Sequence, residues 1–174
     1  MNTLKSLKFA VKGIIYAIKN ERNMRIHTVV AIYTLIFSLF FDMTFVKYAI
    51  LILLIGLVIM AEMFNSAMEN LIDLCSKNYN ATAKVAKDVA AGGVLVICGA
   101  AIAIGFILFN DFSAYIKMWA FFYAHPILII LLSLCIFISY KYILLGPVEM
   151  KNRFYNMLYK IKRKNKKSEL NTQK

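Results

Sequence analysis

Apolar residues along this chain form four long runs, at about residues 26–46, 48–74, 87–109 and 118–140. A run of roughly 20 such residues is long enough to cross a hydrocarbon core of about 30 Å as a helix. Because a backbone in lipid must satisfy its own hydrogen bonds, continuous rather than alternating runs favour helices over a closed barrel. The pattern therefore predicts an all-α integral membrane protein with four spans. We expect Pro126 to kink the last of them.

The first 20 residues have a different pattern, with apolar and basic residues on separate sides of a helix. The apolar positions recur at helical spacing and are Leu4, Leu7, Val11, Ile14 and Ile18. The lysines cluster on another face. A soluble domain can contain such a helix. With four apolar runs following, the pattern favours a surface helix whose cationic side faces anionic lipid headgroups.

Basic residues are distributed unevenly between the connections. Of 21 lysines and arginines, all but Lys47 and Lys117 lie before residue 28, between the second and third runs, or after residue 140. Because basic residues concentrate on the cytoplasmic side of membranes, we predict that both termini are cytoplasmic. The basic tail, residues 149–174, is better explained by contact with anionic lipid than with nucleic acid, so no nucleic-acid partner is expected.

The composition agrees with a membrane protein and argues against a zinc site. Hydrophobic residues make up 61% of the chain, compared with roughly 45–50% in soluble domains. None of the three cysteines, Cys75, Cys98 and Cys135, forms a C-x-x-C pair, and the two histidines lie far apart in sequence. Spacing typical of zinc ligands is therefore missing from the sequence.

A row of polar residues interrupts the second run. Its members are spaced three or four residues apart and are Glu62, Asn65, Ser66, Glu69 and Asp73, so they share one helical face. An acid in the middle of a membrane helix costs about 2.5–3.5 kcal/mol. No Lys or Arg between Tyr48 and Ser76 offsets this cost. A solvated helix end would explain Asp73 but not Glu62, so we interpret the row as a functional site.

The chemistry of these residues suits phosphoryl transfer. Mg²⁺ binds one or two protein carboxylates and leaves positions for phosphate oxygens. Several further charged residues are expected at the cytoplasmic interface beside this face, giving the set Glu21, Glu69, Asp73, Lys87 and Asp88, with Glu62 deeper. Carboxylates, a lysine and an acid within the lipid layer together indicate phosphoryl transfer to a lipid.

Four motifs resemble the prokaryotic diacylglycerol kinase family, which includes the undecaprenol kinases of Gram-positive bacteria. They are F-x-x-K-G at Phe9–Gly13, N-E-x-N-x-R-I-H at Asn20–His27, A-E-x-x-N-S-A-x-E-N-x-x-D at Ala61–Asp73, and A-K-D-x-A-A-G at Ala86–Gly92. The resemblance covers about residues 5–110. It implies a surface helix and three spans in the bacterial plasma membrane, a homotrimer with composite active sites, and ATP and Mg²⁺ as cosubstrates.

The resemblance also implies roles for individual residues. By position, Glu62 corresponds to the catalytic base that takes the proton of the lipid hydroxyl, with Asn65 and Ser66 as its polar support. Glu21 and Glu69 correspond to the metal-binding carboxylates. The implied nucleotide-binding residues are Glu21, Glu69, Asp73, Lys87 and Asp88.

The chain departs from the family pattern in its C-terminal third. We predict a lipid kinase core at residues 1–112, an extra transmembrane helix at 113–148 and a basic cytoplasmic tail at 149–174. His27 and the excess of lysine over arginine suit the Gram-positive branch. They favour undecaprenol as the lipid alcohol, with diacylglycerol as the alternative.

Two other functional classes are compatible with parts of the sequence. A small transporter subunit could use the buried acids to conduct ions or protons, but the third and fourth runs carry almost no facing polar residues. A membrane scaffold could recruit acidic partners with its basic tail, but it would not require Glu62. The lipid kinase accounts for more of the sequence than either.

Overall fold

The structure of the protein is a computed structural model that describes the backbone of residues 3–76 and 80–172 and the side chains of these ranges as far as 156, with residue 159. Six helices make up the described part: α1 Thr3–Asn20, α2 Arg22–Ser38, α3 Phe45–Cys75, α4 Ala81–Leu108, α5 Phe112–Ala124 and α6 Pro126–Thr172. The prediction of an all-α membrane fold is confirmed. Much of the predicted basic tail has side chains outside the described part.

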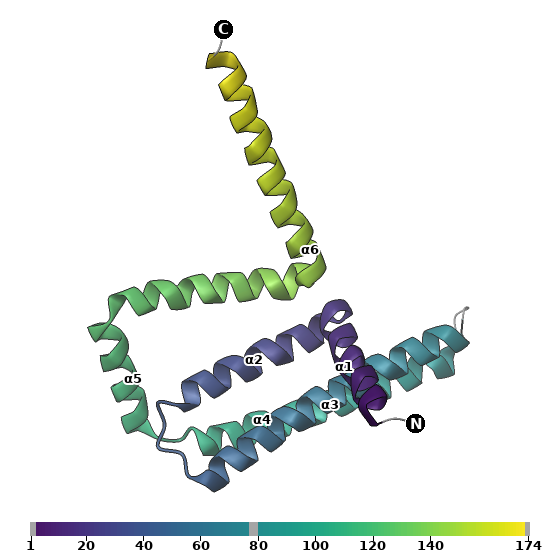
Figure 1. Cartoon of the computed structure of the whole chain (residues 1–174). Helices are drawn as coiled ribbons and strands as arrows, with labels where there is room; N and C mark the ends of the chain where they lie inside the picture. Colours follow the sequence, from purple (N-terminus) through teal and green to yellow (C-terminus); the bar gives the residue numbers. More distant parts are fainter. Residues whose placement is uncertain (1–2, 77–79, 173–174) are drawn as a thin grey trace.

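Helices α3 and α4 form a long antiparallel hairpin that is the centre of the fold (Figure 1). The Thr44 side chain caps α3, and the Asn80 side chain caps α4 by accepting from the amides of Thr82 and Ala83. With 31 and 28 residues, the two helices are about 46 and 42 Å long. They exceed the hydrocarbon thickness, and the end of the hairpin extends past α1 (Figure 1).

Helix α2 lies against α3 but is shorter than the predicted first span. The helix ends at Ser38, whereas the apolar run continues to about residue 46. The Ser38 hydroxyl bonds back to the Leu35 carbonyl at 2.7 Å, and turn hydrogen bonds from Phe40 and Phe41 close the helix end. Its 17 residues give a length of about 25 Å. In the described part, three helices are long and apolar enough to span a membrane, and they belong to α3, α4 and α6.

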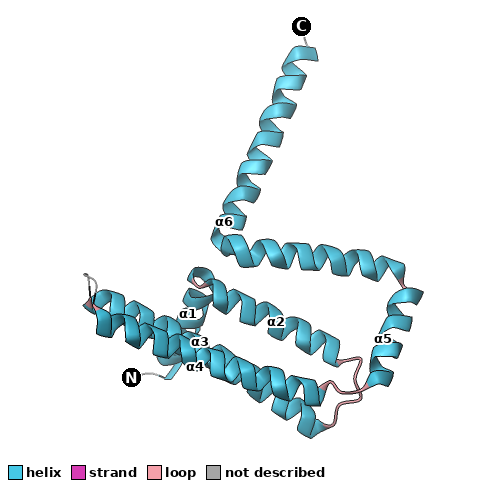
Figure 2. Ribbon diagram, turned by 180° about the vertical axis from the view of Figure 1, so that it is seen from behind, coloured by secondary structure: helices cyan, strands magenta, loops and turns pink. Residues whose placement is uncertain are grey.

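The predicted fourth span is divided in two at Pro126. Proline cannot donate a backbone hydrogen bond and disfavours a helical conformation in the residue before it. His125 accordingly has φ −127° and ψ 71°. Helix α5 crosses the end of the bundle opposite α1, and α6 then runs back beside α2 (Figures 1 and 2). The expected span at about 118–140 was therefore wrong in its limits, because the apolar span begins at Pro126.

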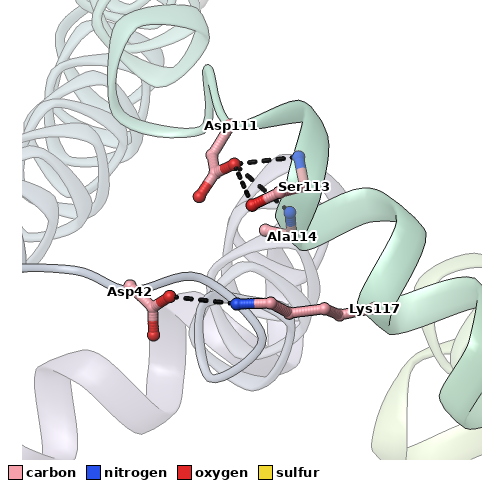
Figure 3. Close-up of polar contacts among 5 residues, drawn as sticks. All are labelled: Asp42, Asp111, Ser113, Ala114 and Lys117. Atoms are coloured by element: carbon pink, nitrogen blue, oxygen red, sulfur yellow. Dashed lines mark hydrogen bonds and ion pairs between the residues drawn. The ribbon is translucent and has the colours of Figure 1, made fainter.

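Polar contacts fix the start of α5 (Figure 3). The Asp111 carboxylate accepts from the Ser113 amide at 2.9 Å and the Ser113 hydroxyl at 2.7 Å, and it also accepts from the Ala114 amide. The hydrogen bond from the Ser113 side chain is the main reason why the pKa of Asp111 lies below its ordinary value. One turn later, Lys117 pairs with Asp42 at 3.3 Å. This pair joins α5 to the connection between α2 and α3.

Candidate active site

The polar face of α3 changes from buried to exposed along the helix. Glu62 is 2% exposed, and Asn65 and Ser66 are also buried, whereas Glu69 is half-buried and Asp73 is exposed. Helices α1 and α2 contact α3. The sequence prediction that Glu62 lies deepest is therefore matched by the structure.

Side chains from α2 surround the Glu62 carboxylate. His27 Nε2 lies 3.9 Å from Glu62 Oε2, and Asn23, an exposed residue of α2, lies near the same carboxylate. The carboxylates of Glu21 and Glu69 lie close enough to repel it electrostatically. Two acidic residues from two segments of the chain thus lie within electrostatic range of Glu62.

The support for this cluster comes from its own helix. The Ser66 hydroxyl donates to the Glu62 carbonyl at 3.0 Å, and the Asn65 amide donates to Glu69 Oε1 at 3.1 Å. Asn65 therefore orients Glu69 directly, whereas Ser66 bonds the backbone of Glu62 rather than its carboxylate. Two buried acceptors, Glu62 Oε2 and Asn65 Oδ1, have no hydrogen-bond partner among the described residues.

Unpaired oxygens beside several carboxylates fit a divalent cation. Buried acceptors normally have a partner, so two neighbouring exceptions call for a group that supplies positive charge or protons. Among the described residues, no three His, Cys, Asp or Glu side chains converge closely enough to form a complete metal site. Mg²⁺ needs fewer, since it retains water and binds substrate phosphates through its remaining positions.

A second group of predicted residues lies farther along the hairpin. Lys87 pairs with Asp73, and both are partly exposed. They line a hollow of about 230 Å³ between the end of α3 and the start of α4. Since Asp73 is eleven residues beyond Glu62, the two groups are separated by about 16 Å along the helix axis. Asp88 is exposed and has no hydrogen bond or ion pair with another described residue.

An apolar cavity leads away from the Glu62 cluster. It has a volume of about 300 Å³ and lies between α2, α3 and α4. His27 of α2 and Gly105 and Phe109 of the hairpin are among the residues that line it. A hydrocarbon chain in this space would have its polar end near His27 and Glu62.

Sequence reasoning assigned no site role to Asn23 and counted Arg25 only as a basic flank. The structure brings Asn23 against Glu62 and buries Arg25 at the corner between α1 and α2. Both residues belong to the N-E-x-N-x-R-I-H motif at Asn20–His27. This motif could have indicated a role for both residues, since it contains more polar positions than the basic end of a surface helix requires.

A sequence model of the family described as Prokaryotic diacylglycerol kinase matches residues 8–109. The chain belongs to this family. Its match contains every residue of the Glu62 cluster and of the Asp73–Lys87 pair. Helices α5 and α6 lie entirely beyond it. The resemblance inferred from the four motifs is confirmed, and with it the class of lipid kinases.

Two curated relatives of this kinase family member are similar over 105 residues, which are 60% of the chain. One, named Diacylglycerol kinase, comes from Synechocystis sp. and is 36% identical over 60% of its own length. The other, named Undecaprenol kinase, comes from Bacillus subtilis (strain 168) and is 34% identical over 85% of its length. The similarity therefore covers less than two thirds of the Synechocystis protein.

Proposed function

We propose that this protein transfers the γ-phosphate of ATP to the hydroxyl group of a membrane lipid alcohol, with Glu62 as the general base. The observation that carries this proposal is the buried Glu62 carboxylate, whose Oε2 has no hydrogen-bond partner. A general base needs a free acceptor within hydrogen-bond reach of the proton it removes. Glu62 has that acceptor beside His27, which lines an apolar cavity.

The remaining residues of the cluster have supporting roles in this proposal. Glu21 and Glu69 would hold Mg²⁺, which when bound neutralises the charge of the ATP phosphates. The Asn65 amide keeps one oxygen of Glu69 in a fixed direction. Ser66 holds the helical turn that carries Glu62. Nearby His27 and Asn23 limit the directions that the Glu62 carboxylate can take.

Lys87, Asp73 and Asp88 are proposed to bind the nucleotide. Lys87 would exchange its contact with Asp73 for phosphate oxygens of ATP, to which a lysine ammonium is a suitable partner. The axial distance of about 16 Å from Glu62 is long for one chain to bridge with a triphosphate. A homotrimer, in which the Lys87 group of one subunit faces the Glu62 cluster of another, accounts for this separation.

The apolar cavity supports a lipid acceptor. Its lining is mostly apolar, and one of its two polar lining residues, His27, lies beside Glu62. A lipid chain in the cavity would bring its terminal hydroxyl to the base. We favour undecaprenol, because His27 and the lysine-rich composition suit the Gram-positive branch, with diacylglycerol as the second candidate.

We place the protein in the bacterial plasma membrane with both termini on the cytoplasmic side. This orientation is supported by the contact between α1 and α6, which brings the basic N-terminal helix and the start of the basic tail to one end of the bundle. ATP is cytoplasmic, and the proposed site lies at that end.

The test is a transfer assay with purified full-length protein in micelles. Labelled ATP and Mg²⁺ are supplied with undecaprenol or with diacylglycerol, and phosphorylated lipid is measured. We expect magnesium-dependent labelling of a lipid alcohol, with the higher kcat/KM for undecaprenol. Labelling of neither lipid would overturn the kinase proposal, and ion flux through vesicles would then favour the transporter.

A further inference from the structure

Helix α6 contains a sharp kink at Gly146 and Pro147. Gly146 has φ +72°, the one positive value among the described residues. Pro147 has no amide hydrogen, so the carbonyl four residues earlier, at Ile143, receives no helical hydrogen bond from it. The kink therefore presents a free backbone acceptor on α6.

Arg25 of α2 occupies this acceptor. Its Nε donates to the Ile143 carbonyl at 3.1 Å, while its Nη1 donates to the carbonyls of Lys19 at 3.0 Å and Ile18 at 3.4 Å. The side chain is only 6% exposed. A buried guanidinium is tolerated where backbone carbonyls surround it, and the C-terminal end of α1 also attracts a cation through its helix dipole. Arg25 thus joins three helices at one point.

Gly146 leaves the space that this contact needs. A Cβ atom at this position would lie 3.3 Å from Arg25 Nη1 and 3.6 Å from the Lys19 carbonyl. Its positive φ also disfavours any side chain. The glycine is therefore matched to the arginine both in conformation and in volume.

The corner between α1 and α2 that Arg25 holds contains Glu21, one of the two carboxylates of the proposed metal site. Glu21 is the N-cap residue of α2, but its side chain makes no capping hydrogen bond. Its negative charge lies within electrostatic range of the Glu62 carboxylate. Backbone hydrogen bonds connect Glu21 to Ala17 and to Arg25. The direction of the Glu21 carboxylate therefore depends on the geometry of this corner.

We propose that the Ile143–Pro147 segment of α6, acting through Arg25, holds the α1–α2 corner so that Glu21 is positioned toward Glu62. Arg25 is then a positioning residue, and α6 adds control of the active site from outside the family-matched segment 8–109. The expected effect on catalysis rests on the proposed kinase function. The contact between Arg25 and α6 does not depend on that function.

The experiment compares full-length Arg25→Gln with Arg22→Gln, an exposed arginine at the start of the same helix. The first variant should raise the Mg²⁺ concentration for half-maximal activity by about tenfold, because Glu21 would lose the fixed backbone that positions it, and losing the support of a metal ligand commonly costs this much. It should leave KM for the lipid unchanged. The control should shift neither quantity. Arg25→Lys, which retains a cationic donor, should recover part of the loss.

Gly146→Ala provides a second route to the same effect, because it disturbs Arg25 without replacing it. We expect a raised Mg²⁺ requirement in the wild-type background and little additional change in Arg25→Gln. An unchanged Mg²⁺ requirement in folded, active Arg25→Gln or Gly146→Ala protein would overturn the positioning role.

Hydrogen exchange tests the contact without any kinase activity. Amides of residues 17–25 should exchange faster in Arg25→Gln and Gly146→Ala than in wild type, and at the wild-type rate in Arg22→Gln. Equal exchange in all four proteins would refute the inferred contact even if lipid phosphorylation is observed. Absence of phosphorylation by the wild type, together with faster exchange in the variants, would instead refute the kinase proposal and leave the contact supported.

Discussion

Arg25 and Glu62 are the charged side chains buried among the described residues, and their surroundings differ sharply. The Arg25 guanidinium donates to three backbone carbonyls from α1 and α6. The Glu62 carboxylate has an oxygen without a hydrogen-bond partner and two further carboxylates nearby. Satisfied buried charges commonly serve structure, whereas an unsatisfied one requires another explanation. The comparison assigns Arg25 to positioning and Glu62 to chemistry.

The largest effect should come from removing the charge of Glu62. Glu62→Gln retains the shape of the side chain but cannot accept the hydroxyl proton, so we expect kcat to fall by about 10³-fold, within the usual range for a general base. Lipid phosphorylation under saturating ATP measures the change. Glu149→Gln, at an exposed glutamate paired with Arg153, is the matched control. Activity of Glu62→Gln close to that of this control would reject the assignment of the base.

A smaller effect is expected at Glu69. Unlike Glu62, this acid is only half-buried, and one of its oxygens accepts a hydrogen bond. Glu69→Gln removes a proposed metal ligand and should raise the Mg²⁺ concentration for half-maximal activity by at least about tenfold. A magnesium titration of lipid phosphorylation gives the value. A titration that superimposes on the wild type would exclude Glu69 as a ligand.

The contact of α2 with α6 should have a modest effect on stability. Tyr33 and Ser139 share a hydrogen bond of 3.1 Å between the two helices. Tyr33→Phe should therefore lower the free energy of unfolding by about 1 kcal/mol. Tyr140→Phe, at an exposed tyrosine, is the control in thermal unfolding experiments. A smaller loss in Tyr33→Phe than in the control would show that this bond contributes nothing to the docking of α6.

The smallest effect should come from Asp111, a partly exposed acid whose Oδ1 accepts three hydrogen bonds. Its folded-state pKa is depressed chiefly by the Ser113 side chain. The contribution to stability is therefore present above the unfolded-state pKa and is lost as the pH falls through the folded-state pKa. Asp111→Asn keeps a capping side chain and should lose this acid dependence, which thermal unfolding between neutral and acidic pH will measure. Identical pH profiles for both proteins would contradict the assignment.

The sequence predicted the elements whose pattern is local. The apolar run and the polar face of the second span gave α3 within a few residues, because both follow from helical spacing alone. The end of α2 at Ser38 was harder to predict, since it depends on a side-chain hydrogen bond. The break at Pro126 was also harder to predict, since a proline can either kink a helix or end it. Hydrophobicity alone does not distinguish a continuous span from two helices at an angle.

The sequence named candidate residues for the site, but it did not predict how their side chains pair. Glu62 and Glu69 share a face of α3, as helical spacing predicts, whereas Glu21 lies at the start of α2 and comes near them only through the packing of α2 on α3. The pairing of Lys87 with Asp73 instead of the deeper acids depends on where α4 begins. Arg25 could not be recognised, because its acceptor at Ile143 lies 118 residues away in the sequence.

The distinction between a structural and a functional buried charge is tested most directly by the thermal stability of Glu62→Gln in micelles, measured beside Arg25→Gln. Neutralising a buried acid that has one unsatisfied oxygen and two further carboxylates nearby should leave Tm unchanged or raise it, since burying the charge costs more than its few contacts return. Arg25→Gln should lower Tm, because it leaves backbone carbonyls without donors. A drop in Tm for Glu62→Gln as large as that for Arg25→Gln would contradict the account, since Glu62 would then be holding the fold together.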